Sequence, residues 1–162
     1  MPIIIQQIKI NMVPNKNHLH KIIKGGDDLK DLAVYYYNCG YNCSQCILKS
    51  FEDKFSYTVD PILYKTLNAV NTGFGVGSIC SALAGGVMIF GLIFDEITAQ
   101  KARLRLLASF DSYYNTLNCS ALSNKRTVHG SCEKIISYTA ASVESIILET
   151  DFLKQQQADI SY

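Results

Sequence analysis

Six cysteines are the most reactive side chains of this 162-residue sequence. They are Cys39, Cys43, Cys46, Cys80, Cys119 and Cys132. Six are more than packing alone requires, and far fewer than a small scaffold held together by disulfides contains. Deprotonated cysteines bind metals and attack disulfides. The cysteines therefore indicate a metal centre or a working dithiol.

Four of the cysteines lie at or near the first turn of a predicted helix. Each comes after a residue that favours the N-cap position: Cys43 after Asn42, Cys80 two residues after Ser78, Cys119 after Asn118, and Cys132 after Ser131. Unpaired backbone N–H groups and the positive end of the helix dipole gather at such positions, which lowers a thiol pKa. A free cysteine can also be a small buried hydrophobe. A packing role, however, gives no reason to prefer helix starts.

Three cysteines form a local cluster with the spacing C-x-x-x-C-x-x-C, from Cys39 through Cys43 to Cys46. Radical-SAM enzymes hold a four-iron cluster with this spacing, but they need an α/β barrel and this sequence predicts no strands. The shorter C-x-x-C of Cys43 and Cys46 lacks the βαβ setting of thioredoxin. At a helix start it is still chemically competent as a dithiol.

Helices are predicted to position these cysteines throughout the chain. They are expected over about residues 27–37, 43–53, 60–70, 79–94, 95–117 and 131–153. The glycine-rich residues 71–78 are predicted to form a loop, and residues 119–131 to be polar and irregular. The predicted fold is all-α, a single-domain bundle of five to six helices around a central apolar helix. Residues 1–26 are predicted to be an N-terminal extension, 27–153 the helical domain, and 154–162 a C-terminal tail.

Charge and the first residues of the chain argue against several classes of protein. Fifteen Lys and Arg residues oppose fourteen Asp and Glu residues, and they are scattered along the sequence. A nucleic-acid binder usually carries a basic stripe, so nucleic acid is not an expected partner. The N-terminus lacks the basic and long apolar regions of a secretory signal, so a cytoplasmic location is predicted. In the cytosol a cysteine cluster is more often metal-binding or catalytic than disulfide-bonded.

Residues 66–94 carry no charged side chain and are most apolar over residues 79–94. A transmembrane helix needs about 20 mostly apolar residues. The densest part is shorter than that and follows a glycine-rich segment. A helix that neighbours surround on all sides is therefore the favoured interpretation, and a membrane span is the alternative.

Several motifs in order resemble the redox-active protein family C_GCAxxG_C_C, named for a Cys-Gly-Ala-x-x-Gly motif and four cysteines. GYNCSQ at residues 40–45 is similar to the family's first cysteine motif, and CSALAGG at residues 80–86 is similar to its second. Cys119 and Cys132 match the last two cysteines. The resemblance covers roughly residues 28–150.

This sequence departs from the family pattern at three places. Ser81 replaces the motif glycine, the glycine-rich loop before Cys80 is shorter than usual, and Cys39 and Cys46 are additions. The shortened loop puts any substrate or partner role of that loop in doubt. The four signature cysteines are intact.

The resemblance implies a cysteine-bound iron–sulfur site in a homodimer, since related domains accompany haem and an iron–sulfur centre in split-Soret cytochromes. Covalent haem is not expected here, because the sequence has no C-x-x-C-H. Four thiolates suffice for a two-iron or four-iron cluster. The predicted ligands are the four signature cysteines, for which Cys39 or Cys46 could substitute: Cys43, Cys80, Cys119 and Cys132.

The favoured prediction is thus a redox-active protein that binds an iron–sulfur cluster and transfers electrons with a redox partner protein. The alternative is an enzyme, a metal-free thiol–disulfide oxidoreductase in which Cys43 attacks and Cys46 or another cysteine resolves. A third interpretation is a structural Cys₄ zinc site. The sequence does not decide the cluster type, the partner, or the roles of Cys39 and Cys46.

Overall fold

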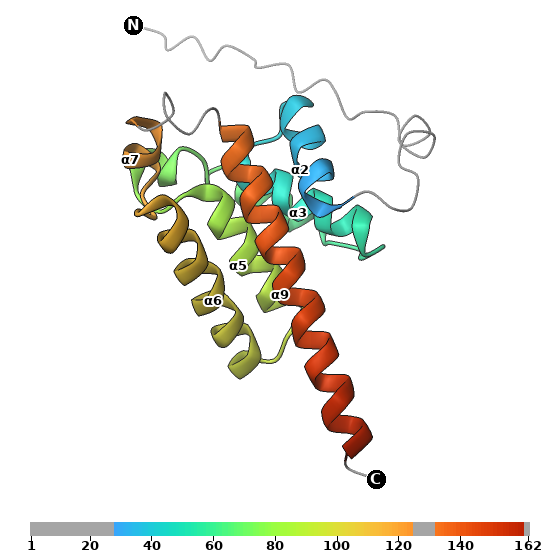
Figure 1. Ribbon diagram of the computed structural model, residues 1–162. Coiled ribbons are helices and arrows are strands. Elements are labelled where there is room, and N and C mark those ends of the chain that lie inside the picture. The colour runs from blue at the N-terminus through green and yellow to red at the C-terminus, as the bar shows by residue number, and fades with distance from the viewer. Residues whose placement is uncertain (1–27, 125–131, 161–162) are drawn as a thin grey trace, which may run out of the picture.

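The computed structural model describes residues 28–124 and 132–160, which form an all-α bundle (Figure 1). No strand occurs within these ranges, where an isolated bridge joins Ile79 and Asn118. The predicted fold class is therefore confirmed. The helical elements are α2 (Leu29–Asn38), α3 (Cys43–Lys54), α4 (Pro61–Leu67), η1 (Gly73–Gly77), α5 (Ser81–Ile93), α6 (Glu96–Tyr114), α7 (Cys119–Asn124) and α9 (Cys132–Ile160).

Helix α5 is the predicted central apolar helix, and it packs against α3, α6 and α9. Two adjacent glycines let its neighbours approach closely. A Cβ at Gly85 would lie 2.6 Å from the Ser44 carbonyl oxygen of α3, and one at Gly86 would meet side chains of α6 and α9. Helix α5 has 13 residues. None of the helices in the described part of the chain is long and apolar enough to cross a membrane.

Two helix starts follow directly from the sequence. At α3, the Asn42 side chain accepts the Gln45 N–H while the Gln45 side chain accepts the Asn42 N–H, which completes a capping box. At α4, the Asp60 side chain accepts the Ile62 N–H, and Pro61 occupies the first helical position. These contacts fix where both helices begin.

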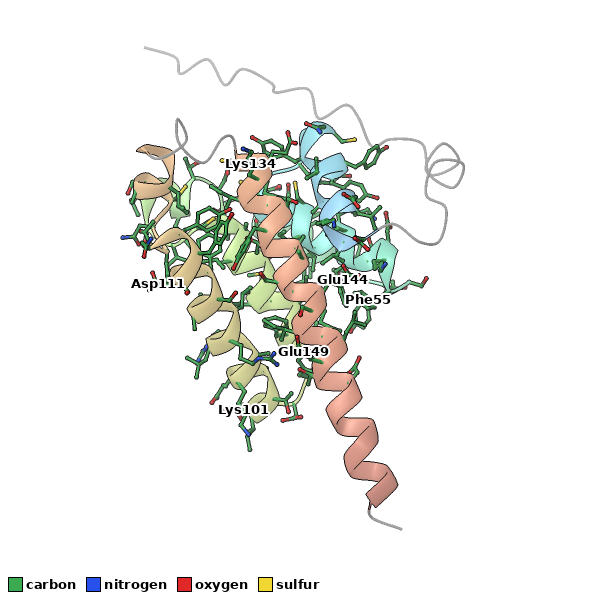
Figure 2. The ribbon with its side chains drawn as sticks, viewed as in Figure 1. Phe55, Lys101, Asp111, Lys134, Glu144 and Glu149 are labelled. Atoms are coloured by element: carbon green, nitrogen blue, oxygen red, sulfur yellow. The ribbon has the colours of Figure 1, made fainter. Side chains whose placement is uncertain are left out.

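The start of α2 is satisfied by a residue distant in the sequence. Asp28 occupies the N-cap position of α2, but its side chain makes no capping hydrogen bond. Instead the Glu144 carboxylate of α9 accepts the Leu29 N–H at 2.9 Å and pairs with Lys54 of α3 at 3.3 Å. Glu144 thus joins three helices at one point (Figure 2).

Two helical segments differ from the prediction. Helix α9 was expected to end near residue 153 but continues to Ile160, beyond the rest of the bundle (Figure 1). Helix α7 occupies part of a segment predicted to be irregular. In α7 the Cys119 carbonyl accepts a hydrogen bond from the Ser123 hydroxyl at 2.9 Å. This hydrogen bond lies within the short helix. The segment has no periodic apolar pattern, so the sequence did not reveal the helix.

The glycines of α5 provide a test of this packing. Gly85→Ala should lower the free energy of unfolding by about 1–3 kcal/mol, because its Cβ would press on the α3 backbone. Gly91→Ala is the matched control in the same helix, since no atom lies within 4 Å of its added Cβ. That variant should be more stable than the original protein by about 0.5–1 kcal/mol. Urea unfolding measures both, and equal effects would contradict the close approach of α5 to α3.

Candidate functional site

The four signature cysteines line one cavity of about 370 Å³. Cys43, Cys119 and Cys132 are the first residues of α3, α7 and α9. Cys80 is itself the N-cap of α5, whereas the sequence had suggested Ser78 for that position. Four chain segments therefore meet at the cavity through their helix starts.

Two backbone hydrogen bonds bring Cys80 and Cys119 together. The Cys80 N–H donates to the Leu117 carbonyl at 2.8 Å, and the Cys119 N–H donates to the Ser78 carbonyl at 2.6 Å. The chain segments that precede α5 and α7 are thus joined side by side. Because the bonds involve the two cysteines' own N–H groups, their positions relative to each other are fixed by the main chain.

The glycine-rich loop η1 packs against the start of α7. A Cβ at Gly73 would lie 2.7 Å from the Cys119 Cβ, and a Cβ at Gly77 would lie 2.7 Å from the Ser120 Cβ. Thr72 and Phe74 have positive φ angles of 52° and 60°, which side-chain-bearing residues rarely adopt. The loop contacts α7 in this strained form, and the two residues that precede it, Asn71 and Thr72, border the cavity.

Several lining residues were not predicted as site residues. Asn71 and Thr72 come from the loop before η1, and Ser81 is the first residue of α5. The rest of the lining combines apolar and aromatic side chains with the α3 cap: Tyr37, Gly40, Tyr41, Asn42, Leu122 and Ile135. Proximity in sequence to Cys80 was the one available signal for Ser81, whereas Asn71 and Thr72 reach the cavity only through the turn of the loop.

Burial changes the expected protonation of the thiols. A hydrogen bond with Cys132, followed by burial, raises the pKa of the Cys43 thiol above its usual range. Burial raises the pKa of Cys80 to about 11, although the N–H groups of Ala82 and Leu83 act in the opposite direction. The expectation that helix starts favour thiolates is therefore wrong for both residues. At Cys43 the hydrogen bond with Cys132 and then burial raise the pKa, and at Cys80 removal from water outweighs the backbone donors.

Cys39 and Cys46 do not line the cavity. The Cys46 side chain is fully buried, and its thiol donates to the Tyr41 carbonyl oxygen at 3.4 Å. Cys39 is the C-cap of α2 and forms a hydrogen bond with the Tyr35 hydroxyl. The structure thus pairs Cys43 with Cys132 rather than with Cys46. None of the six cysteines, all of which lie among the described residues, forms a disulfide.

The side chains around the cavity determine what it could bind. Within residues 28–124 and 132–160, no three His, Cys, Asp or Glu side chains are grouped so that they could hold a metal ion. Four thiols nevertheless border the same cavity, and no charged side chain is among its described lining residues. The donor set is therefore purely sulfur with neutral polar neighbours.

The protonation of buried Cys46 leads to a testable pH dependence. Burial raises its pKa to about 12, so the folded state holds this proton more tightly than the unfolded state does. The stabilisation is complete below about pH 9 and is lost as the pH rises through 12. Between pH 7.5 and pH 10 it should fall by about 1.4 kcal/mol.

Chemical unfolding of reduced, metal-free protein at the two pH values measures this loss. In Cys46→Ser the loss should be smaller by about that amount, because serine does not titrate in this range. Cys39→Ser is the control. An identical loss in Cys46→Ser and the original protein would show that the buried thiol is not responsible.

Comparison with known proteins agrees with the site. Residues 41–146 match the model of the family described as "Putative redox-active protein (C_GCAxxG_C_C)". The match contains all four cysteines that line the cavity. No curated protein and no solved structure is significantly similar to the chain. The matched region covers more than half of the sequence, and the chain belongs to the C_GCAxxG_C_C family of redox-active proteins.

Proposed function

We propose that the four cysteines of the cavity bind an iron–sulfur cluster, of two or four irons, through which the protein exchanges electrons with a redox partner protein. The observation that carries this proposal is that four thiols from four separate helix starts border one cavity of about 370 Å³. Four cysteines are the usual ligand number for either cluster type. The proposed ligands are Cys43, Cys80, Cys119 and Cys132.

Because no three His, Cys, Asp or Glu side chains of the described residues are grouped for a single metal ion, the proposal is a cluster rather than a lone ion. A tetrahedral zinc site needs four sulfurs about 2.3 Å from one point. A cluster distributes its thiolate ligands over two or four irons, so its cysteines stand farther apart. The cavity volume of about 370 Å³ is also many times the roughly 30 Å³ that one water molecule takes up in the liquid, so the cavity has room for more than one small ion.

The protonation and surroundings of the cavity cysteines determine what metal binding would require. Metal binding needs thiolates, and the thiols of Cys43 and Cys80 have raised pKa values, so assembly must release their protons. The N–H groups of Ala82 and Leu83 lower the pKa of the Cys80 thiol and would help to stabilise its thiolate. A bound cluster would supply one-electron chemistry, and the apolar side chains of Leu122 and Ile135 would limit its contact with water.

The test is an absorption spectrum with iron and acid-labile sulfide analysis of anaerobically purified protein. Visible charge-transfer bands with equal amounts of iron and sulfide are expected. Cys43→Ser should lose most of both, because it removes a cavity thiol, whereas Cys39→Ser should keep them, because Cys39 does not line the cavity. Colourless protein without iron, or protein with zinc alone, would exclude the cluster.

A second candidate function is favoured by the hydrogen bond between the Cys43 and Cys132 thiols. In a metal-free thiol–disulfide oxidoreductase, the Cys43 thiolate would attack a substrate disulfide and release one substrate thiolate. Cys132 would then attack the mixed disulfide and release the second, which leaves a Cys43–Cys132 disulfide. The substrate gains two electrons and the protein loses two. The raised pKa of Cys43 works against this function at neutral pH.

Oxidation of metal-free protein in a glutathione redox buffer tests the second candidate. Peptide mapping should find a Cys43–Cys132 disulfide, and Cys132→Ser should accumulate a mixed disulfide on Cys43 because the resolving thiol is missing. Cys46→Ser should behave like the original protein, because the Cys46 thiol is directed to the Tyr41 carbonyl. A Cys43–Cys46 disulfide, or none, would contradict this pairing.

A further inference from the structure

Ser81 differs from the other polar residues of the four-cysteine cavity in its burial. Its side chain lines the cavity and only 1% of the residue's surface is exposed. Asn71 and Thr72, which also line the cavity, are exposed to solvent. The Asn42 side chain is occupied by the α3 cap and the Leu67 carbonyl. Ser81 is thus a buried hydroxyl beside the thiols.

The Ser81 hydroxyl forms a hydrogen bond as an acceptor but not as a donor among the described residues. Its oxygen accepts the Gly73 N–H at 3.3 Å, which ties the strained loop before Cys80 to the start of α5. Among the hydrogen bonds of the described residues, none has the Ser81 O–H as donor. An accepted hydrogen bond polarises a hydroxyl and makes it a better donor. A buried O–H without an acceptor is costly unless something in the cavity takes its proton.

The chemistry of the cavity indicates what that acceptor is. The thiolates and sulfides of a bound cluster are anionic acceptors, and no charged side chain lines the cavity among the described residues. Negative charge there must be balanced by N–H and O–H dipoles. Cys80 directly precedes Ser81, and the N–H groups of Ala82 and Leu83 act to lower the pKa of its thiol. The Ser81 O–H would add a donor next to that pair.

We propose that Ser81 is a positioning residue whose hydroxyl donates a hydrogen bond to a sulfur of the bound cluster and raises its reduction potential. The reduced cluster carries one more negative charge than the oxidised cluster, so a donor stabilises the reduced state more. One electron passes from the redox partner protein, or from dithionite in the test, to the cluster, and no covalent bond forms or breaks. The inference rests on the cluster proposed above.

Potentiometric titration with dithionite, followed by visible absorption, tests the role of Ser81. Ser81→Ala should shift the ratio of reduced to oxidised cluster about tenfold at a fixed potential, which corresponds to a midpoint about 59 mV lower for a one-electron couple. Ser81→Thr keeps the hydroxyl and should restore the original potential. Ser50→Ala is the matched control, because Ser50 is equally buried but its O–H donates to the Ile47 carbonyl.

The outcomes separate this inference from the proposed function. Iron and sulfide are first measured in every variant, and original protein without a cluster would overturn the proposed function and this inference with it. Original protein with a cluster, but with the same potential in Ser81→Ala, would overturn the role of Ser81 alone. If Ser81→Ala loses iron, Ser81→Gly takes its place with more room in the cavity. Loss of iron in both variants would make Ser81 a structural support and overturn the tuning role.

Discussion

The close contact between α5 and α3 is the constraint on which the site depends. At Gly85 the α5 backbone approaches the α3 backbone so closely that a Cβ would lie 2.6 Å from the Ser44 carbonyl oxygen. Ser44 directly follows Cys43, and Gly85 lies within the helix that Cys80 begins. The contact that packs the two helices therefore also sets how far apart the first two cavity cysteines stand. The same backbone contact thus packs α5 against α3 and places Cys43 relative to Cys80.

The other two cysteines depend on different forces. Cys119 is tied to the segment before α5 by main-chain hydrogen bonds at both Ser78 and Cys80. Cys132 begins α9, which Glu144 anchors to α2 and α3. The α5–α3 contact, the two main-chain hydrogen bonds and the Glu144 contacts together hold the four helix starts that border the cavity.

Much of the fold was predictable because local signals agree with the final packing. The capping residues Asn42 and Asp60 mark helix starts in the sequence and act as caps in the structure. The continuous apolar run of α5 predicts a helix covered on all sides, and α3, α6 and α9 cover it. What could not be predicted depends on distant contacts. The cap of α2 comes from Glu144, 115 residues away from Leu29.

Four cysteines of the candidate site were singled out from the sequence, but its other lining residues and its electrostatics were not. Asn42 caps α3 beside Cys43 as its residue type indicates, whereas Cys80 is itself the N-cap of α5 in place of Ser78. Which thiols face each other, and how deeply, depends on tertiary packing. Cys43 and Cys46 are three residues apart, yet the Cys46 thiol donates to the Tyr41 carbonyl while Cys43 pairs with Cys132.

The balance between burial and backbone donors determines how such a site can work. At Cys80 the N–H groups of Ala82 and Leu83 favour the thiolate, but burial still raises the pKa to about 11. A neutral thiol is therefore the resting form when only protons compete for the sulfur. A bound metal, as proposed above, would supply the positive charge that the described lining lacks, and the same backbone donors would then stabilise its sulfur ligands. A cavity that disfavours free thiolates can in this way favour thiolates bound to iron.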